Sequence, residues 1–155
     1  MIHLVPTTRD NWLEALRLQV HEHQLHYVPS VAVSLAKVHI RPDGEHCDYF
    51  PLCIMSDDLL IGFVMVTVDV STNWCYWMNG FLIDQAEQGK GYAKAAIQLV
   101  IDYVKAHYLQ SICLNLTVNA ENTLARALYI KCGFVETGDI YDGEVVYRLD
   151  FAQAK

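Results

Sequence analysis

The sequence predicts one domain over residues 1–155 of the α/β (α+β) class, with a mixed, mostly antiparallel twisted sheet of about seven strands and helices on both faces. Three observations support this prediction. With 53% hydrophobic and 19% charged residues, the chain can bury one sizeable core. The spacing of apolar residues changes several times between periods of 2 and 3.6 residues. A strand, a helix and a second strand follow one another within residues 74–118, which indicates a parallel crossover.

The N-terminal region predicts one strand followed by short helices. Residues 2–5 form the strand, and residues 11–19 have the apolar spacing of a helix. Residues 21–27 continue in helical spacing, and Ser30 then caps a third helical stretch over residues 31–38. We therefore expect a bent pair of short helices before the sheet continues.

The middle of the chain predicts an antiparallel meander and the clearest helix of the sequence. After a loop with a Pro-Asp-Gly turn, segments rich in β-branched and aromatic residues predict strands over residues 49–55, 59–68 and 74–83. The period then changes from 2 to 3.6 directly after Gly89 and Gly91, which predicts a helix over residues 91–107.

The C-terminal region predicts a strand, a helix and a hairpin. Its elements are a strand over residues 112–118, a helix over residues 123–132 that ends before Gly133, and strands over residues 134–140 and 145–151. The Asp142-Gly143 pair between the last two strands is typical of a tight hairpin turn. This completes the expected seven strands.

Charge and cysteine content restrict the partners and the compartment. Eleven Lys and Arg against eighteen Asp and Glu give a net charge of −7, which disfavours nucleic acid and favours cationic ligands. An odd number of cysteines without a C-x-x-C pair predicts a reducing compartment. The N-terminal residues lack the pattern of a signal peptide, and the apolar runs are shorter than the ~20 residues that span a bilayer. We therefore expect a cytoplasmic protein without membrane contact.

A glycine loop between a strand and a helix is the first candidate binding site. Its residues 88–93 place backbone N–H groups at a helix N-terminus, where an anion such as a diphosphate is favoured. The loop does not match a dinucleotide fingerprint, because Lys94 stands where the third glycine is needed, and it does not match a Walker A loop. A tight strand-to-helix turn without a ligand remains an alternative for this loop taken alone.

Two motifs at separate places in the sequence together resemble those of the GNAT superfamily of acetyl-CoA-dependent N-acetyltransferases. The hallmark [RQ]-x-x-G-x-[GA] is matched by Gln88, Gly91 and Ala93. The later pattern N-x-x-A-x-x-L-Y-x-x-x-G-F is matched by Asn122, Ala125, Leu128, Tyr129, Gly133 and Phe134. The order of predicted elements also resembles this superfamily over essentially the whole chain.

The resemblance implies a cosubstrate, acetyl-CoA, and a set of residues that bind it. The diphosphate would be held by the backbone of Gln88, Gly89, Lys90, Gly91, Tyr92 and Ala93. The pantetheine arm would pair with the backbone of Phe81, Leu82 and Ile83. Asn122 is assigned to the pantetheine and Tyr129 to the sulfur, where a phenol with a pKa near 10 can act as the general acid for the departing thiolate.

Within the superfamily, the sequence looks most like the bacterial diamine and polyamine acetyltransferases, in residues 77–84 and 24–36. The resemblance implies an acceptor such as spermidine, and the acceptor site is expected to contain His21, Glu22, Tyr27, Trp77 and Asn79. Several polyamine acetyltransferases carry a carboxylate at the position of Asn79, and an amide cannot act as a base.

The general base is therefore sought in the preceding helical segment. Glu22 is the predicted catalytic carboxylate there, and His21, His23 and His26 are further candidates. We predict no metal, because on a helix only His23 and His26 would be neighbours.

Other functions remain open on the sequence. The same fold could acetylate another amine, such as an amino acid, an aminoglycoside-like compound or a protein N-terminus. It could also bind CoA without catalysis, a possibility raised by the amide at Asn79. A nicotinamide-binding Rossmann domain is disfavoured by Lys94 and by the antiparallel meander. Since dimers are common in the superfamily, a homodimer is expected.

Overall fold

The change of hydrophobic period along the chain corresponds to a sheet with helices packed on it. The computed structural model describes residues 1–152. Its strands are β1 (Ile2–Pro6), β2 (Asp48–Ser56), β3 (Leu59–Val68), β4 (Tyr76–Ile83), β5 (Cys113–Val118), β6 (Val135–Tyr141) and β7 (Glu144–Asp150). Its helices are α1 (Trp12–Ala15), α2 (Val31–Ile40), α3 (Tyr92–His107) and α4 (Thr123–Lys131), with 3-10 turns η1 (Glu22–Gln24) and η2 (Gln85–Glu87).

The seven strands form one sheet in the order β1-β2-β3-β4-β5-β7-β6. Every neighbouring pair is antiparallel except β4 and β5, which are joined by the α3 crossover and run parallel. The predicted fold class, the seven strands and the mixed topology are therefore confirmed.

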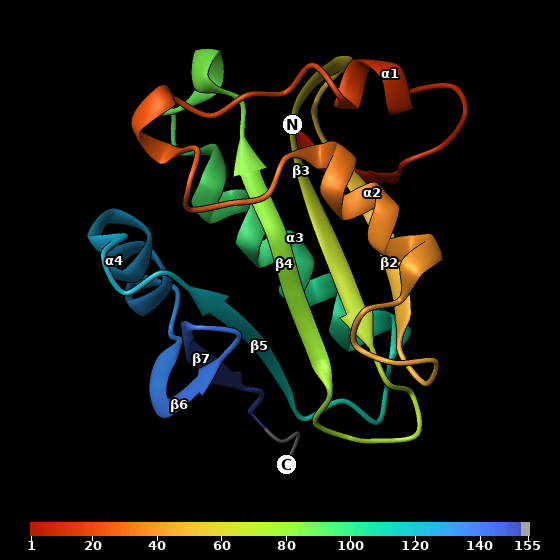
Figure 1. Cartoon of the computed structure of the whole chain (residues 1–155), viewed down its shortest axis with the longest axis vertical. Coiled ribbons are helices and arrows are strands. Elements are labelled where there is room, and N and C mark those ends of the chain that lie inside the picture. Colours follow the sequence, from red (N-terminus) through yellow and green to blue (C-terminus); the bar gives the residue numbers. More distant parts are fainter. Residues whose placement is uncertain (153–155) are drawn as a thin grey trace.

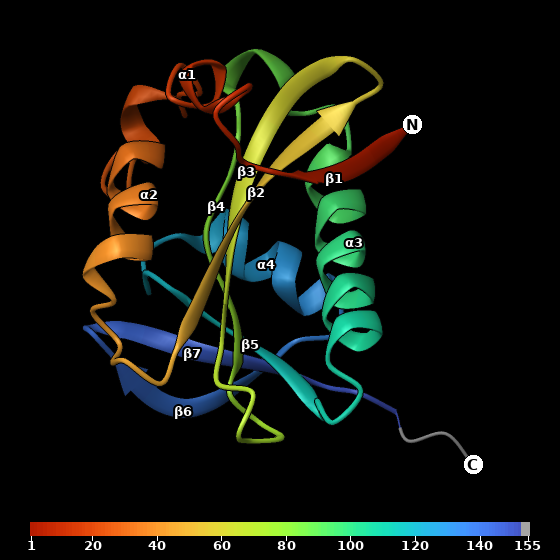
Figure 2. The same cartoon turned by 90° about the vertical axis from the view of Figure 1, so that its right-hand side faces the viewer.

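Both faces of the sheet are covered, as Figure 2 shows, with α2 on one side and α3 on the other. On the α3 face, Ile97, Val100 and Val104 join Tyr129 of α4 in one apolar core. On the α2 face, Ala15 of α1 and Val31 of α2 form a second core with β2 and β3. Because both faces are buried, nine of the ten residues of β3 are buried as a continuous run rather than in alternation. Within residues 1–152, no helix combines the length and the apolar character needed to cross a membrane.

The segment between α1 and α2 differs from the predicted long helices. The helix expected over residues 11–19 is only four residues long, because the Gln19 backbone is hydrogen-bonded to the loop after β4. Its N–H donates to Asp84 Oδ1 at 3.0 Å, and its carbonyl accepts from the Gln85 N–H at 2.7 Å. The helix expected over residues 21–27 is only the short turn η1, in which the Gln24 side chain accepts from the His21 N–H at 3.0 Å. The hydrogen bonds of Gln19 are tertiary and override the helical spacing after α1, whereas the bond between His21 and Gln24 is local.

A bulge and a divergence of strands open the middle of the sheet. In β4, Gly80 and Phe81 lie opposite a single residue of β3, and Gly80 has the positive φ of 59° that this bulge requires. A Cβ at Gly80 would lie 2.5 Å from Ser34 Oγ of α2, so only glycine fits. Beyond the pairing of Trp77 with Asn115, β4 and β5 no longer pair, and Figure 1 shows the two strands diverging.

Candidate active site

A single cavity of about 1570 Å³ follows the divergence of β4 and β5. One end is the glycine loop before α3, and the other end lies between the α2–β2 loop and the β6–β7 turn. In Figure 2, the loop before α3 lies near one end of the long axis of the molecule, and the α2–β2 loop and the β6–β7 turn lie toward the other. The cavity therefore connects a backbone-lined end with an end lined by aromatic and acidic side chains. We call the first the loop end and the second, after the acceptor that the sequence resemblance implies, the amine end.

The loop end is built from left-handed glycines at the start of a long helix. Gly89 and Gly91 have φ values of 80° and 83°, and a Cβ added at either would meet no atom within 4 Å. Gly91 is the N-cap of the 16-residue helix α3. The loop thus exposes backbone N–H groups and the positive end of a helix dipole to open space. This geometry fits an anion such as a diphosphate.

The remaining loop residues divide between the cavity wall and solvent. Gln88, Tyr92 and Ala93 line the cavity together with both glycines. Lys90 is not part of the wall, and its ammonium pairs with Glu87 at 2.9 Å. This hydrogen bond with Glu87 raises the pKa of Lys90.

Gln24 is a site residue that the sequence did not reveal. Its amide and the amide of Gln88 are paired reciprocally, with N···O distances of 3.0 and 3.2 Å. The Gln88 amide also donates to the Ile83 carbonyl at 3.0 Å. The pair links the 20–29 segment to the glycine loop. A glutamine in a helical pattern gives no signal of such a partner.

The two strands that diverge supply the cavity's middle. Phe81, Leu82 and Ile83 line it from β4, on the side where this strand has lost its parallel neighbour. Asn79 also lines it, with its Nδ2 donating to Thr67 Oγ1 at 3.0 Å. The Asn79 Oδ1 is buried and has no hydrogen-bond partner among residues 1–152. This unsatisfied oxygen lies behind the cavity surface and is one of the few buried polar atoms of the described residues without a partner.

Helix α4 brings a capping residue and a buried tyrosine to the same cavity. Asn122 is the N-cap, and its Oδ1 accepts from the Ala125 N–H at 3.4 Å. Tyr129 is buried and lines the cavity two turns further along. Burial raises the pKa of its phenol, and nearby Cys132 and the charge of Glu144 add to this rise. Tyr129 is therefore protonated at neutral pH and can donate a hydrogen bond into the cavity.

The structure places some of the residues predicted for the acceptor site in the cavity wall and leaves others outside. Tyr27 and Trp77 line the cavity, and so does His26 among the predicted base candidates. His21 and Glu22 do not line it, and Glu22 is exposed on η1.

The predicted spacing of the histidines is also corrected. On the short turn η1, the rings of His21 and His23 stack 5.6 Å apart instead of facing in different directions as on an α-helix. Among the described residues, no group of three or more His, Cys, Asp or Glu side chains is arranged to hold a metal.

Three further residues of the amine end were missed because they come from distant segments. Asp43 is in the α2–β2 loop, Tyr141 ends β6, and Glu144 begins β7. The Tyr141 hydroxyl donates to Asp43 Oδ1 at 2.7 Å, and the Thr117 hydroxyl donates to Glu144 Oε1 at 2.9 Å. The hairpin turn was predicted, but no local pattern indicates which loop it meets.

Comparisons with known proteins agree with this geometry. The sequence profile of the Acetyltransferase (GNAT) family matches residues 12–134. The chain is 29% identical over 152 residues to the spermine/spermidine N(1)-acetyltransferase of Bacillus subtilis (strain 168), covering 94% of this chain and 95% of that protein. Its fold is similar to spermidine N-acetyltransferase from Vibrio cholerae, solved with CoA and spermine (TM-score 0.72, 21% identity, 97% and 94% covered).

The fold is about equally similar to a solved acetyltransferase that is named for a different acceptor. The aminoglycoside acetyltransferase AAC(6')-Ib, solved with coenzyme A, has a TM-score of 0.75 at 16% identity, with 96% and 93% of the two chains covered. The similarity of backbones therefore does not discriminate between acceptors. The family profile covers most of the chain and includes both motifs of the site, so this protein belongs to the acetyltransferase (GNAT) family.

Proposed function

We propose that this acetyltransferase moves the acetyl group of acetyl-CoA directly to a primary amine of a diamine or polyamine such as spermidine. The observation that carries the proposal is the continuous cavity, which joins an anion-binding glycine loop, a buried tyrosine and an acidic, aromatic end. The loop end suits a diphosphate, and the unpaired edge of β4 suits an extended arm that adds like a strand. The relative of 29% identity named for spermine and spermidine supports this acceptor class.

The charge of the amine end favours a cationic acceptor. At the amine end, Asp43, Asp142 and Glu144 line the cavity and outnumber Lys37 of α2, whereas Lys94 and Lys131 line the cavity from α3 and α4. Carboxylates concentrated in one cleft raise the local concentration of a cation. Trp77 adds an aromatic face, on which an alkylammonium can rest.

Tyr129 is proposed to stabilise the leaving sulfur. Acetyl-CoA supplies an activated thioester, and the thiolate that departs has a pKa near 8.5. Because burial raises the pKa of Tyr129 above its ordinary value, complete proton transfer to the thiolate is unfavourable. The phenol therefore donates a hydrogen bond as negative charge grows on the sulfur, and the general-acid role is limited to that donation.

Glu144 is proposed to accept the proton of the amine. A primary ammonium with a pKa near 10.4 must lose one proton to water before attack, because only the neutral amine has a lone pair, and the attacking nitrogen loses a second proton as the amide forms. Glu144 is half-buried in the cavity wall, and its charge acts on Tyr129. Glu22 is exposed outside the wall, so we do not assign the base to it. Once the nitrogen begins to bond to carbon, its proton becomes far more acidic, and a carboxylate can remove it.

The test is acetyl transfer from acetyl-CoA to spermidine, spermine, putrescine, lysine and an aminoglycoside, read by product mass because five cysteines would react with a thiol reagent. Selective acetylation of the polyamines is expected. In the same assay, Glu144→Gln keeps the acceptor for Thr117 but loses the base, and should lower kcat by about 100-fold. CoA binding without acetylation of any amine would indicate a non-catalytic domain and would end the polyamine proposal.

A further inference from the structure

We propose that the hydrogen bond between Tyr141 and Asp43 is a latch that closes the amine end of the cavity, so that these two residues determine the length of amine the enzyme accepts. The inference rests on the proposed function, because it concerns the acceptor of that reaction. The limit on the length of the amine chain is assigned to the contact between the α2–β2 loop and the end of β6.

The latch joins two segments that are far apart in the sequence. Tyr141 Oη and Asp43 Oδ1 are 2.7 Å apart, although the residues are 98 positions apart in the sequence. Both residues line the cavity, and the Tyr141 ring lies against Trp77 of β4, with centroids 5.8 Å apart. In Figure 2, the β6–β7 turn meets the α2–β2 loop on the α2 face of the sheet, far from the glycine loop. Together these contacts hold both side chains in the cavity wall at the amine end.

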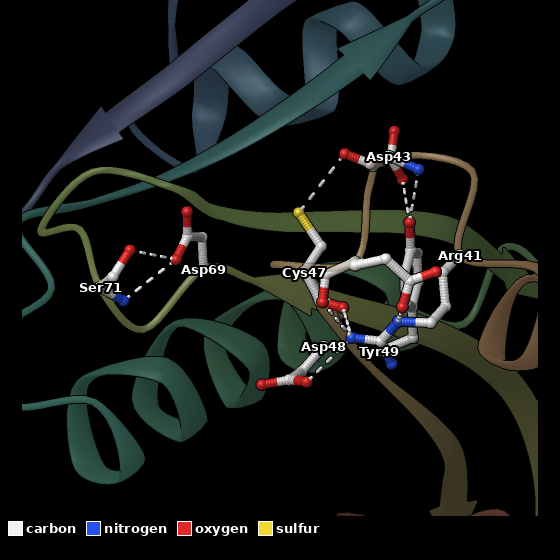
Figure 3. A network of polar contacts seen from close by, with 8 residues as sticks. Arg41, Asp43, Cys47, Asp48, Tyr49, Asp69 and Ser71 are labelled. Atoms are coloured by element: carbon white, nitrogen blue, oxygen red, sulfur yellow. Dashed lines mark hydrogen bonds and ion pairs between the residues drawn. The ribbon is translucent and has the colours of Figure 1, made fainter.

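The Asp43 side of the latch is held rigidly by its own loop, as Figure 3 shows. Tyr49 is buried, and its hydroxyl donates to Asp43 Oδ2 at 2.7 Å and accepts from the Asp43 N–H at 2.8 Å. The Arg41 guanidinium bonds the Cys47 and Glu45 carbonyls and the Asp48 carboxylate, which fixes the two ends of the loop. Asp43 therefore offers its second oxygen to Tyr141 without having to move.

The Tyr141 side of the latch lies on a weakly held strand. All seven residues of β6 are exposed, and it pairs only with β7 at the edge of the sheet. That pairing is interrupted between Glu136 and Ile140. With little apolar burial, the tip of the hairpin depends on specific contacts such as the one to Asp43. The hydrogen bond to Asp43 raises the pKa of Tyr141 to about 12, so the hydroxyl remains a donor at neutral pH.

The chemistry of the latch suits an amine chain that ends there. The carboxylate of Asp43 and the faces of Trp77 and Tyr141 border the same space, so the last methylenes and the distal ammonium of a diamine fit against it. A longer diamine needs the space that the closed latch occupies. Loss of the Tyr141 hydroxyl leaves the ring on Trp77 but releases the hairpin, which lengthens the cavity.

The experiment compares kcat/KM for the series from 1,3-diaminopropane to 1,8-diaminooctane in wild type, Tyr141→Phe, Asp43→Ala and Asp142→Asn. Asp142→Asn is the matched control, because it removes a carboxylate from the same turn but leaves the latch in place. We expect Tyr141→Phe and Asp43→Ala to change the ratio of kcat/KM for the longest diamine to kcat/KM for the shortest. This ratio should rise about fivefold or more, as loss of one hydrogen bond implies. Asp142→Asn should change kcat/KM by the same factor for diamines of every length.

Hydrogen exchange of the amides in residues 139–144 reports on the latch without any amine. Exchange should be faster in Tyr141→Phe and unchanged in Asp142→Asn, while CoA affinity stays the same in both variants. Unchanged exchange, or a length profile in Tyr141→Phe equal to that of the wild type, overturns the latch alone and leaves the proposed function intact. A wild-type enzyme that acetylates none of the diamines overturns the proposed function and the length limit together.

Discussion

The two ends of the cavity differ in the atoms that form their walls, backbone atoms at one end and side-chain atoms at the other. The loop end consists of backbone groups from one continuous segment, residues 88–93, with two left-handed glycines that leave space for a ligand. The amine end consists of side chains from segments that are far apart in sequence, among them Asp43, Trp77 and Tyr141. A backbone site tolerates changes of side chain but not of dihedral angles, whereas a side-chain site can change its ligand with single substitutions. This difference explains how one family keeps its donor and changes its acceptor.

The largest effect is expected where the two ends meet, at Tyr129. Tyr129→Phe should lower kcat by about 10²-fold to 10³-fold and leave CoA affinity unchanged, because only the hydrogen bond to the leaving sulfur is lost. The raised pKa of Tyr129 keeps it protonated as pH rises through neutrality, so it contributes no falling limb there. The rates of the wild type and of Tyr129→Phe, plotted against pH, should thus rise in parallel as the ammonium of the amine substrate deprotonates. A limb between pH 7 and 9 that is present only in the wild type would contradict this role.

A pair of matched glycine substitutions tests whether the loop end depends on dihedral angles. Gly91 at the loop and Gly143 at the hairpin turn have φ values of 83° and 80°, both with open space at Cβ. Alanine at either position costs about 1 to 2 kcal/mol of backbone strain. We expect Gly91→Ala to weaken CoA binding about tenfold and Gly143→Ala to leave it unchanged.

Calorimetric titration with CoA measures the two affinities, and thermal unfolding shows whether both variants are equally destabilised. Equal CoA affinities for the two variants would mean that the loop end does not depend on the left-handed conformation of Gly91.

At the amine end, a single aromatic side chain should influence only the acceptor. Trp77→Leu removes the ring that packs on Tyr141 and should raise KM for the amine about three- to tenfold, with KM for acetyl-CoA constant. Trp74→Leu is the control, because Trp74 also lines the cavity but is 49% exposed. Steady-state kinetics with each substrate varied in turn provide both constants. An equal effect of the two substitutions would assign no special role to the Trp77 face.

The smallest effect is expected from Lys90, the loop residue outside the cavity wall. Its ammonium pairs with Glu87 at the surface, and such exposed pairs contribute little. Lys90→Ala should change CoA affinity by less than about threefold, and the change should fade at high salt. A tenfold loss that persists in high salt would instead make Lys90 a direct phosphate ligand.

The contrast between local segments and contacts made by distant segments also separates the accurate sequence predictions from the inaccurate ones. The strand over residues 59–68, the Ser30 cap of α2 and the start of α3 after Gly91 depend on local spacing and local capping, and all three are confirmed. The helix predicted over residues 21–27 is wrong, because Gln24 satisfies the His21 backbone and pairs with Gln88, 64 residues away. A local pattern cannot contain information about a distant partner.

The sequence by itself determined the fold class, the glycine loop and the motif that contains Asn122 and Tyr129. The fold class follows from the spacing of apolar residues along the chain. The glycine loop and the motif are short segments whose backbone conformation follows from residue type and spacing. Only the tertiary structure decided which side chains form the amine end, left Glu22 outside the cavity wall, and brought Asp43 to Tyr141. The physical reason is that the divergence of β4 and β5 and the packing of the hairpin fix those neighbours, and neither is encoded by the residues that meet there.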